Sequence, residues 1–441
     1  MSYTEKDRLR SWIYLAIVFF TALPISGVFY SFGIFIDIFL KEYGGTNSKA
    51  GWAGSVLLCS QGVSSLVGVY LFRYFGLRPV MFVSAALAAL SFLSTSYVPS
   101  LEYVFLTYSI PFGIACGFYE CVTVVSLREY FRIYLGRATG VRYAGQRCGP
   151  MLFSYLIPII FDIAGWKTMM ACFSSLGLMF LLLAISYRPP SDLDCADGGM
   201  LRRKQENNVK IVDCLHVTLS LLKDRRILLI LSGNALFSVV EYIPNMFVIQ
   251  YARSLGYPIS KSKWLLVTFS LLSIVSRSTF GCVADYVMKL NKMSVLLSAV
   301  VVLFGISSAC FSSTQSLVIL AVYMGGIGIL DGMYWVMLSF VAMEISDPRH
   351  SDIVFTLILF SQAFGYLIGP PAIGFFYDLN GNFSHVLYAV GAAAVTAGIF
   401  ILAGALLKPT NSQLLRKMTK SLVGTSELKC SLVVFERETV L

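Results

Sequence analysis

The chain has 441 residues, of which 57% are hydrophobic and only 13% are charged. A soluble domain usually carries about 25% charged residues, so this composition excludes an ordinary soluble protein. The net charge of +10 is spread over segment ends and loops, which argues against a nucleic-acid partner and for basic residues beside a membrane. The ten cysteines form no CxxC pair and there are three histidines, so no metal site is expected. Because the sequence also lacks a nucleotide-binding loop and a nucleophile elbow, we expect neither an enzyme nor a bound cofactor.

Twelve long apolar stretches follow one another along the chain. Most of them reach the length of about 20 residues that a helix needs to cross the hydrocarbon core. The first is too long for the apolar region of a cleavable signal peptide, so we expect it to remain as a membrane helix. The stretches cover residues 12–40, 51–74, 79–98, 103–127, 135–163, 166–187, 227–252, 262–288, 293–312, 316–344, 352–377 and 386–407.

These stretches divide six and six around a polar, basic segment at residues 188–226. A membrane carrier built from two similar halves has this arrangement. We therefore predict an all-α membrane protein with one six-helix bundle at 1–187, a linker at 188–226, a second six-helix bundle at 227–407 and a polar tail at 408–441. The linker is interpreted as a solvated connection between the halves. Its Arg-Arg-Lys run at 202–204 leaves a site for anionic lipid headgroups as the alternative.

The distribution of lysine and arginine predicts the orientation in the membrane. If both termini are cytoplasmic, 25 of the 34 basic residues lie in inner segments and six lie in outer loops. Short cytoplasmic loops carry an excess of basic residues. We therefore expect both termini to be cytoplasmic.

Two related patterns close the second and the eighth stretch. The first contains Arg73, Gly76 and Arg78, and the second contains Gly281 and Asp285. Both resemble the cytoplasmic signature of the major facilitator superfamily, although the first copy lacks its acid. The glycine permits close helix contact and the acid can pair with a base or a helix N-terminus. The resemblance implies a role for these five residues in the conformational change.

Five further patches are spread along the chain. They are Ser31-Phe32-Gly33-Ile34-Phe35; Tyr130-Phe131 with Arg137-Ala138-Thr139-Gly140 and Ala144-Gly145; Pro244 with Tyr251-Ala252 and Gly256; Arg277 with Gly281 and Asp285; and Gly369-Pro370-Pro371-Ala372-Ile373-Gly374 with Tyr377-Asp378. Together they resemble the monocarboxylate transporter family of the major facilitator superfamily, of which this chain looks like a divergent member. The resemblance implies the superfamily fold, a carboxylate substrate, a plasma-membrane location and, as in some relatives, a single-span accessory glycoprotein.

Two departures from the family weaken proton-coupled lactate transport as the default function. The proton-coupled lactate carriers bear a lysine where this chain has Ile34. They bear an aspartate one turn before Arg277, where this chain has Ser273. If the substrate differs from that of the family, we expect the first six helices to determine it, because the second half follows the family more closely.

Charged residues inside the membrane stretches are the best candidates for a site. Each costs about 2.5–3.5 kcal/mol at a helix centre, so each needs a partner or a wet cavity. Arg277 can bind a substrate carboxylate through two parallel hydrogen bonds, or it can pair with a buried acid such as Glu241 or Asp331. The residue pattern leaves these two interpretations open, and the resemblance implies contact with the substrate.

Arg142 and Arg147 add charge to the fifth stretch, where the family has small or apolar residues. Five helical positions place them about 140° apart, so they cannot share one face. Arg142 is a second candidate for substrate binding. The alternative is that both arginines are charge partners for Glu120 or Glu129.

Four acids are candidates for proton coupling, because a buried carboxyl group can carry a proton. Glu241 precedes Pro244, which is expected to break the helix and expose backbone carbonyls. Asp331 follows a glycine-rich run that permits close packing. The four are Asp37, Glu120, Glu241 and Asp331.

Aromatic residues complete the set of predicted substrate contacts. Tyr119, Tyr334 and Trp335 lie in stretches that form the central cavity of a two-bundle carrier. They either contact an apolar part of the substrate or simply pack between helices.

We therefore predict a secondary transporter that moves a small organic anion, monocarboxylate-like, or a zwitterion by rocking its halves around a midplane site, with a proton as a possible co-substrate. One alternative is an uncoupled facilitator of a neutral or amino-acid-like solute. Another is a transporter-like receptor or scaffold.

Overall fold

The computed structural model describes residues 9–32, 34–35, 38–39, 47–187, 211–312, 314–347, 350–380 and 383–407. Throughout this part of the chain the regular structure is helical, as predicted. Large apolar side chains such as Leu90 and Ile163 are exposed on the outside of the helices. Such a surface is stable only when lipid covers it.

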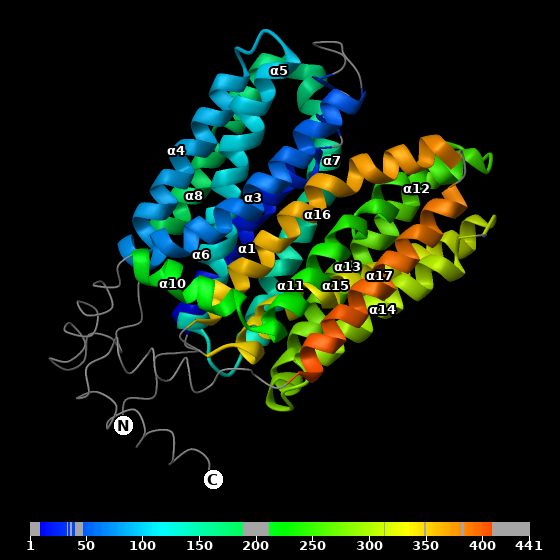
Figure 1. Cartoon of the computed structure of the whole chain (residues 1–441). Helices are drawn as coiled ribbons and strands as arrows, with labels where there is room; N and C mark the ends of the chain where they lie inside the picture. The colour runs from blue at the N-terminus through cyan, green and yellow to red at the C-terminus, as the bar shows by residue number, and fades with distance from the viewer. Residues whose placement is uncertain are drawn as a thin grey trace, which may run out of the picture.

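The first half consists of helices that run up and down between the two ends of the molecule (Figure 1). In chain order they are α1 (Leu9–Tyr30), α3 (Asn47–Phe75), α4 (Leu77–Thr95), α5 (Leu101–Val104), the π-helical turn η1 (Phe105–Ser109), α6 (Ile110–Tyr130), α7 (Leu135–Phe173) and α8 (Leu176–Ser186). The segment α5–η1–α6 forms one continuous candidate span. Gly76 separates α3 from α4 with a φ of 83°, a conformation that glycine adopts without steric cost.

The second half repeats this arrangement. Its helices are α11 (Arg225–Val240), α12 (Ile243–Ser254), α13 (Ile259–Lys289), α14 (Met293–Cys310), α15 (Leu317–Ile345), α16 (Ser351–Asn380) and α17 (Phe383–Leu406). Pro244 lies in the first turn of α12, so the break that it was expected to cause falls at Glu241 and Tyr242. There the missing backbone N–H of proline costs nothing.

Eleven helices or helix runs of the described chain are long and apolar enough to cross a membrane. One of them, Leu135–Ser186, has 52 residues and contains two of the predicted stretches. Its helical backbone is interrupted at Gly165, which has a φ of 71°. Because this run contains two membrane helices, the eleven candidate spans correspond to twelve membrane helices.

The segment predicted as a solvated linker is helical in part. Helix α10 spans Ile211–Leu222, within the predicted linker at 188–226. The Tyr70 hydroxyl on α3 lies 2.7 Å from the Thr218 hydroxyl on α10. Leu215 and Leu219 of the same helix are exposed. The polar composition of the segment concealed this short amphipathic helix, which packs against α3.

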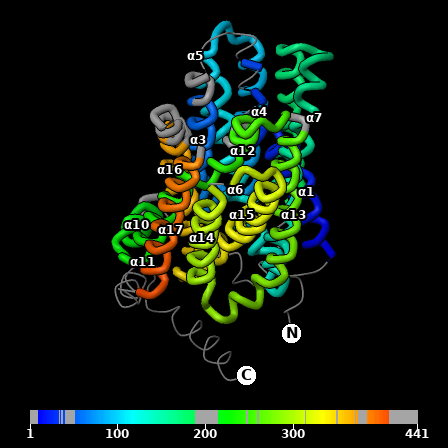
Figure 2. Tube along the Cα trace, turned by 90° about the vertical axis from the view of Figure 1, so that its right-hand side faces the viewer, coloured from blue at the N-terminus to red at the C-terminus, as the bar shows by residue number. Residues whose placement is uncertain are grey.

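The two halves meet along two helix pairs, α3 with α16 and α7 with α13, which lie side by side in both views (Figures 1 and 2). Gly140 and Gly281 allow the second pair to approach closely, because a Cβ on Gly281 would lie 2.7 Å from the Gly136 carbonyl oxygen. Figure 1 shows the halves together near the end where α1 begins and α17 ends, and spread apart toward α5 and α12. We call the first of these the terminal end.

Candidate functional site

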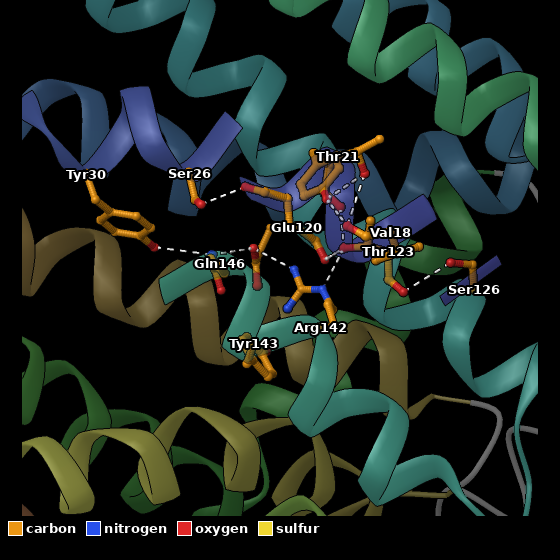
Figure 3. A network of polar contacts seen from close by, with 12 residues as sticks. Val18, Thr21, Ser26, Tyr30, Glu120, Thr123, Ser126, Arg142, Tyr143 and Gln146 are labelled. Atoms are coloured by element: carbon orange, nitrogen blue, oxygen red, sulfur yellow. Dashed lines mark hydrogen bonds and ion pairs between the residues drawn. The ribbon is translucent and has the colours of Figure 1, made fainter. Parts of the chain in front are cut away.

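A charged group lies inside the first half, where α1, α6 and α7 come together (Figure 3). Arg142 on α7 and Glu120 on α6 form an ion pair with 2.7 Å between Nη2 and Oε2, and both side chains are almost completely buried. The Arg142 Nε also donates to the Thr123 hydroxyl at 3.0 Å. Gln146 donates to the same Glu120 oxygen at 3.2 Å and to the Tyr30 hydroxyl at 3.4 Å. Arg142 and Gln146 thus both bind the Oε2 atom of Glu120, and its other carboxylate oxygen, Oε1, has no hydrogen-bond partner.

A second charged group joins the halves. The Arg277 Nη2 on α13 lies 3.1 Å from the Asp331 Oδ2 on α15. The Arg147 Nη2 on α7 lies 3.7 Å from the same oxygen. The Ser273 hydroxyl donates to this oxygen at 2.6 Å and accepts from the Arg277 Nε at 3.3 Å. Two guanidinium groups thus share one carboxylate, which leaves an excess of one positive charge.

Aromatic rings connect the two charged groups. The guanidinium of Arg142 lies 4.4 Å from the centre of the Tyr143 ring, and that of Arg277 lies 5.9 Å from the same ring. Arg277 also lies 5.9 Å from the Trp335 ring and donates to the Tyr143 carbonyl at 3.1 Å. Cations are attracted to the faces of such rings. The Tyr143 ring therefore links the charged group inside the first half to the charged group that joins the halves.

Glu241 is a third buried acid, at the break between α11 and α12. Its exposed fraction is 3%, and the Tyr366 hydroxyl donates to its Oε2 at 2.7 Å. Its other carboxyl oxygen has no hydrogen-bond partner. The adjacent Tyr242 ring lies 6.3 Å from that of Tyr30, so aromatic side chains from both halves meet beside these acids.

A small cavity opens between the halves next to these groups. Glu120, Trp335 and Tyr366 line it together, so it borders both the first charged group and the neighbourhood of Glu241. Its remaining lining is Leu58, Gln61, Gly62, Leu359 and Gln362. Glu120, which lines the cavity, and five further residues of the charged and aromatic groups have a buried polar atom with no hydrogen-bond partner: Glu120 Oε1, Arg142 Nη1, Tyr143 Oη, Gln146 Oε1, Arg147 Nε and Glu241 Oε1. Buried polar groups are normally paired, so these residues retain hydrogen-bonding capacity that the protein itself does not use.

Comparison with known proteins identifies the fold. The Major Facilitator Superfamily model matches residues 18–258 and again residues 230–434, which is about once for each half. The chain belongs to the Major Facilitator Superfamily. The twelve helices in two bundles are the fold of this superfamily.

The curated relatives of this superfamily member confirm the narrower resemblance. Monocarboxylate transporter 4 of Rattus norvegicus is 26% identical over 88% of this chain and 82% of that protein. Monocarboxylate transporter 1 of Bos taurus is 24% identical over 96% of this chain and 89% of that protein. Monocarboxylate transporter 3 of Rattus norvegicus is 24% identical over 88% of this chain and 79% of that protein.

Solved structures of the superfamily show the same fold at low identity. The fucose:proton symporter of E. coli has a TM-score of 0.64 at 12% identity, covering 89% of this chain and 99% of its own. A proton:xylose symporter has a TM-score of 0.61 at 13% identity, covering 90% and 94%. The human organic anion transporter MFSD10 has a TM-score of 0.60 at 16% identity, covering 89% and 97%.

The structure brings most of the predicted site residues together. Arg142 and Arg147 point to different halves, as their angular separation on α7 required. Trp335 lines the cavity, whereas the Tyr334 hydroxyl donates to Asn234 Oδ1 at 2.5 Å inside the second half. The Tyr119 hydroxyl donates to the Val18 carbonyl at 3.2 Å inside the first half. Asp37, the fourth predicted coupling acid, lies outside the described residues.

The five residues of the repeated signature lie at the terminal end. Arg73 holds Asp352 of the other half through its Nε at 2.9 Å and its Nη2 at 2.5 Å. Asp285 accepts a hydrogen bond from the backbone N–H of Gly136 at the start of α7, at 2.6 Å. Gly281 contacts α7, while Gly76 forms the turn after α3. Arg78 donates to the Tyr187 carbonyl at 3.1 Å within the first half.

Sequence reasoning missed three participants: Gln146, Tyr366 and Asp352. Gln146 could have been found, because it follows Arg142 by four residues in an apolar stretch and therefore lies on the same helix face. No sequence signal linked Tyr366 to Glu241, because the two residues are brought together only by the packing of α16 against α11.

Proposed function

We propose that this superfamily member is a secondary transporter that carries a small organic anion or zwitterion through its carboxylate group. The observation that supports this proposal is the sharing of Asp331 by Arg277 and Arg147. One carboxylate cannot neutralise two guanidinium groups, so a substrate carboxylate is the natural second anion. The names of the relatives, monocarboxylate transporters 1, 3 and 4, agree with this substrate class.

Movement of the substrate would follow from the way the halves meet. Arg147 comes from the first half, while Arg277 and Asp331 come from the second. A rocking motion of one half against the other changes the distance between these groups. The substrate would then be bound when Arg147 and Arg277 lie close together and released when they separate.

We propose Glu241 as the group that accepts a proton when transport is coupled to one. An ionised carboxylate in a buried place is costly unless it is paired. Glu120 and Asp331 have arginine partners, whereas Glu241 accepts its hydrogen bond from the uncharged Tyr366 hydroxyl. Protonation of Glu241 would therefore remove the least compensated charge of the site.

Uptake of labelled carboxylates into proteoliposomes, with and without an inward pH gradient, tests these proposals. We expect Arg277→Ala to lower uptake at least tenfold, because it removes the charge that holds the carboxylate. Glu241→Gln should abolish the stimulation by the pH gradient and leave uptake without a gradient in place. Arg253→Ala, which changes an exposed arginine, is the control. Unchanged uptake by Arg277→Ala would refute the carboxylate site, and binding without uptake would favour the receptor alternative.

We propose the plasma membrane as the location, with both termini in the cytoplasm. The excess of basic residues in the segments on the terminal side supports this orientation. An antibody against an epitope tag at either terminus should stain cells only after permeabilisation. Staining of intact cells at one terminus would contradict the topology.

A further inference from the structure

We infer that the transported solute is a zwitterion, whose ammonium group is received by Glu120 while its carboxylate is held by Arg147 and Arg277. This inference rests on the proposed function and specifies its substrate class. It starts from Glu120 and Gln146, each of which has a buried acceptor atom without a hydrogen-bond partner.

Glu120 lines the cavity and has a carboxylate oxygen without a hydrogen-bond partner. Its Oε2 receives both Arg142 and Gln146, whereas its Oε1 is buried and has no hydrogen-bond partner. The exposed fraction of the residue is 2%, and it lines the cavity. A carboxylate oxygen can only accept hydrogen bonds, so the group that completes this site must be a donor.

Two more acceptors come from the neighbouring side chains. Gln146 Oε1 has no hydrogen-bond partner, and the exposed fraction of Gln146 is 7%. Glu241 Oε1 is unpaired in the second half, beside Tyr366, which lines the cavity. An ammonium group carries three donors, which matches three acceptors better than a single hydroxyl group does.

The charges of the site lead to the same substrate class. In the described part of the chain, three buried or nearly buried arginines surround the site together with three carboxyl groups: Arg142, Arg147, Arg277, Glu120, Glu241 and Asp331. With all six ionised, their charges cancel. A zwitterion brings its carboxylate to the excess positive charge of Arg147 and Arg277 and its ammonium group to the acceptor side, where Glu241 has no cationic partner, whereas a carboxylate without an ammonium group supplies only the first of these partners.

The two binding groups are joined by aromatic rings. The guanidinium groups of Arg142 and Arg277 both lie close to the Tyr143 ring, and Trp335, which lines the cavity, lies close to Arg277. The positive side of the site, Arg147 with Arg277, and the acceptor side, Glu120 with Gln146, thus belong to two different bonded groups, one around Asp331 and one around Glu120. A solute with both charges near each other can contact the two sides at once.

A matched series of solutes tests the inference in proteoliposomes. Labelled alanine, lactate and propionate share the carboxylate and differ in the group beside it, and phenylalanine, phenyllactate and phenylpropionate repeat the comparison with a larger side chain. We expect kcat/KM for the amino acid to exceed that for the unsubstituted acid by at least about tenfold in one or both sets, because unpaired acceptors reject a substrate that lacks the donor. Equal or faster uptake of the unsubstituted or hydroxy acids would overturn the zwitterion while leaving carboxylate transport standing. If none of the six solutes crosses, the proposed function fails as well.

Two variants test whether the preference for the amino acid over the unsubstituted acid depends on the acceptor oxygens of Gln146 and Glu120. Gln146→Leu removes an uncharged acceptor and should lower the ratio of amino-acid uptake to uptake of the unsubstituted acid at least fivefold. Glu120→Gln should reduce the preference for the amino acid further, because it removes the negative charge that receives the ammonium group. Arg253→Ala is again the control, because Arg253 is exposed. A parallel loss for all solutes in Gln146→Leu would show a structural role and would contradict the inference.

Discussion

At the residue scale, the buried arginines are stabilised by ion pairs with buried carboxylates. One of these pairs lies within the first half, and another group spans the two halves. The Glu120–Arg142 pair belongs to the first half alone, with side-chain exposures of 3% and 1%. The Asp331 group draws Arg147 from the first half and Arg277 from the second. The first pair is therefore independent of the rocking motion, and the second group can change with it. This difference explains why two arginines five residues apart on α7 have different roles.

Removal of one member of the internal pair should destabilise the protein. Arg142→Gln leaves Glu120 buried without a cation, which costs about 3 kcal/mol or more. The double variant Arg142→Gln with Glu120→Gln should recover most of this loss, because no unpaired charge remains. Thermal unfolding in detergent measures both, with Arg253→Gln as the control at an exposed arginine. A double variant no more stable than Arg142→Gln would contradict the coupling.

At the element scale, glycines determine how closely the helices of the two halves approach. A Cβ on Gly281 would lie 2.7 Å from the Gly136 carbonyl oxygen and 3.0 Å from the Gly140 Cα, both of which belong to the backbone of α7. Backbone atoms cannot move aside as a flexible side chain can. The contact between α7 and α13 therefore requires glycine at this position, and in this conformation it brings Arg147 and Arg277 on the same helices close to Asp331.

Gly281→Val should separate α7 from α13. We expect uptake to fall at least about tenfold, since forcing side-chain atoms into a packed contact costs about 1–3 kcal/mol. Gly326→Val on α15 is the matched control, because a Cβ added at Gly326 would meet no atom within 4 Å. Uptake by the control should stay within twofold. Equal losses in the two variants would show that valine in any membrane helix is harmful and that the α7–α13 contact is not special.

At the scale of the whole molecule, this structure is closed at the terminal end. Arg73 and Asp352 join α3 to α16 there, and the Gly136 N–H and Asp285 join α7 to α13. Arg128 adds hydrogen bonds across the halves to the Ser351 hydroxyl at 3.0 Å and the Ser339 carbonyl at 2.9 Å. These bonds must break before a solute can leave on this side. The repeated signature near Gly76 and Gly281 thus lies where the halves are held together.

The twelve helices, their division into halves and the identity of the buried charges all follow from the sequence alone. Apolar length decides which segments enter the membrane, and the six-and-six pattern decides the architecture. These are properties of consecutive residues, so they can be recognised without knowing the fold. The family resemblance also depends on short runs of neighbouring residues, such as the one around Arg277, so it too can be recognised without knowing the fold.

Which charges face one another depends instead on how the helices pack. The sequence left Glu241 and Asp331 as equal partners for Arg277, and Glu120 and Glu129 as equal partners for the arginines of α7. Packing of α13 against α15 places Arg277 beside Asp331, while the break before Pro244 leaves Glu241 with a tyrosine. Partner choice depends on distances of a few ångströms between helices far apart in the chain, and no pattern of neighbouring residues contains that information.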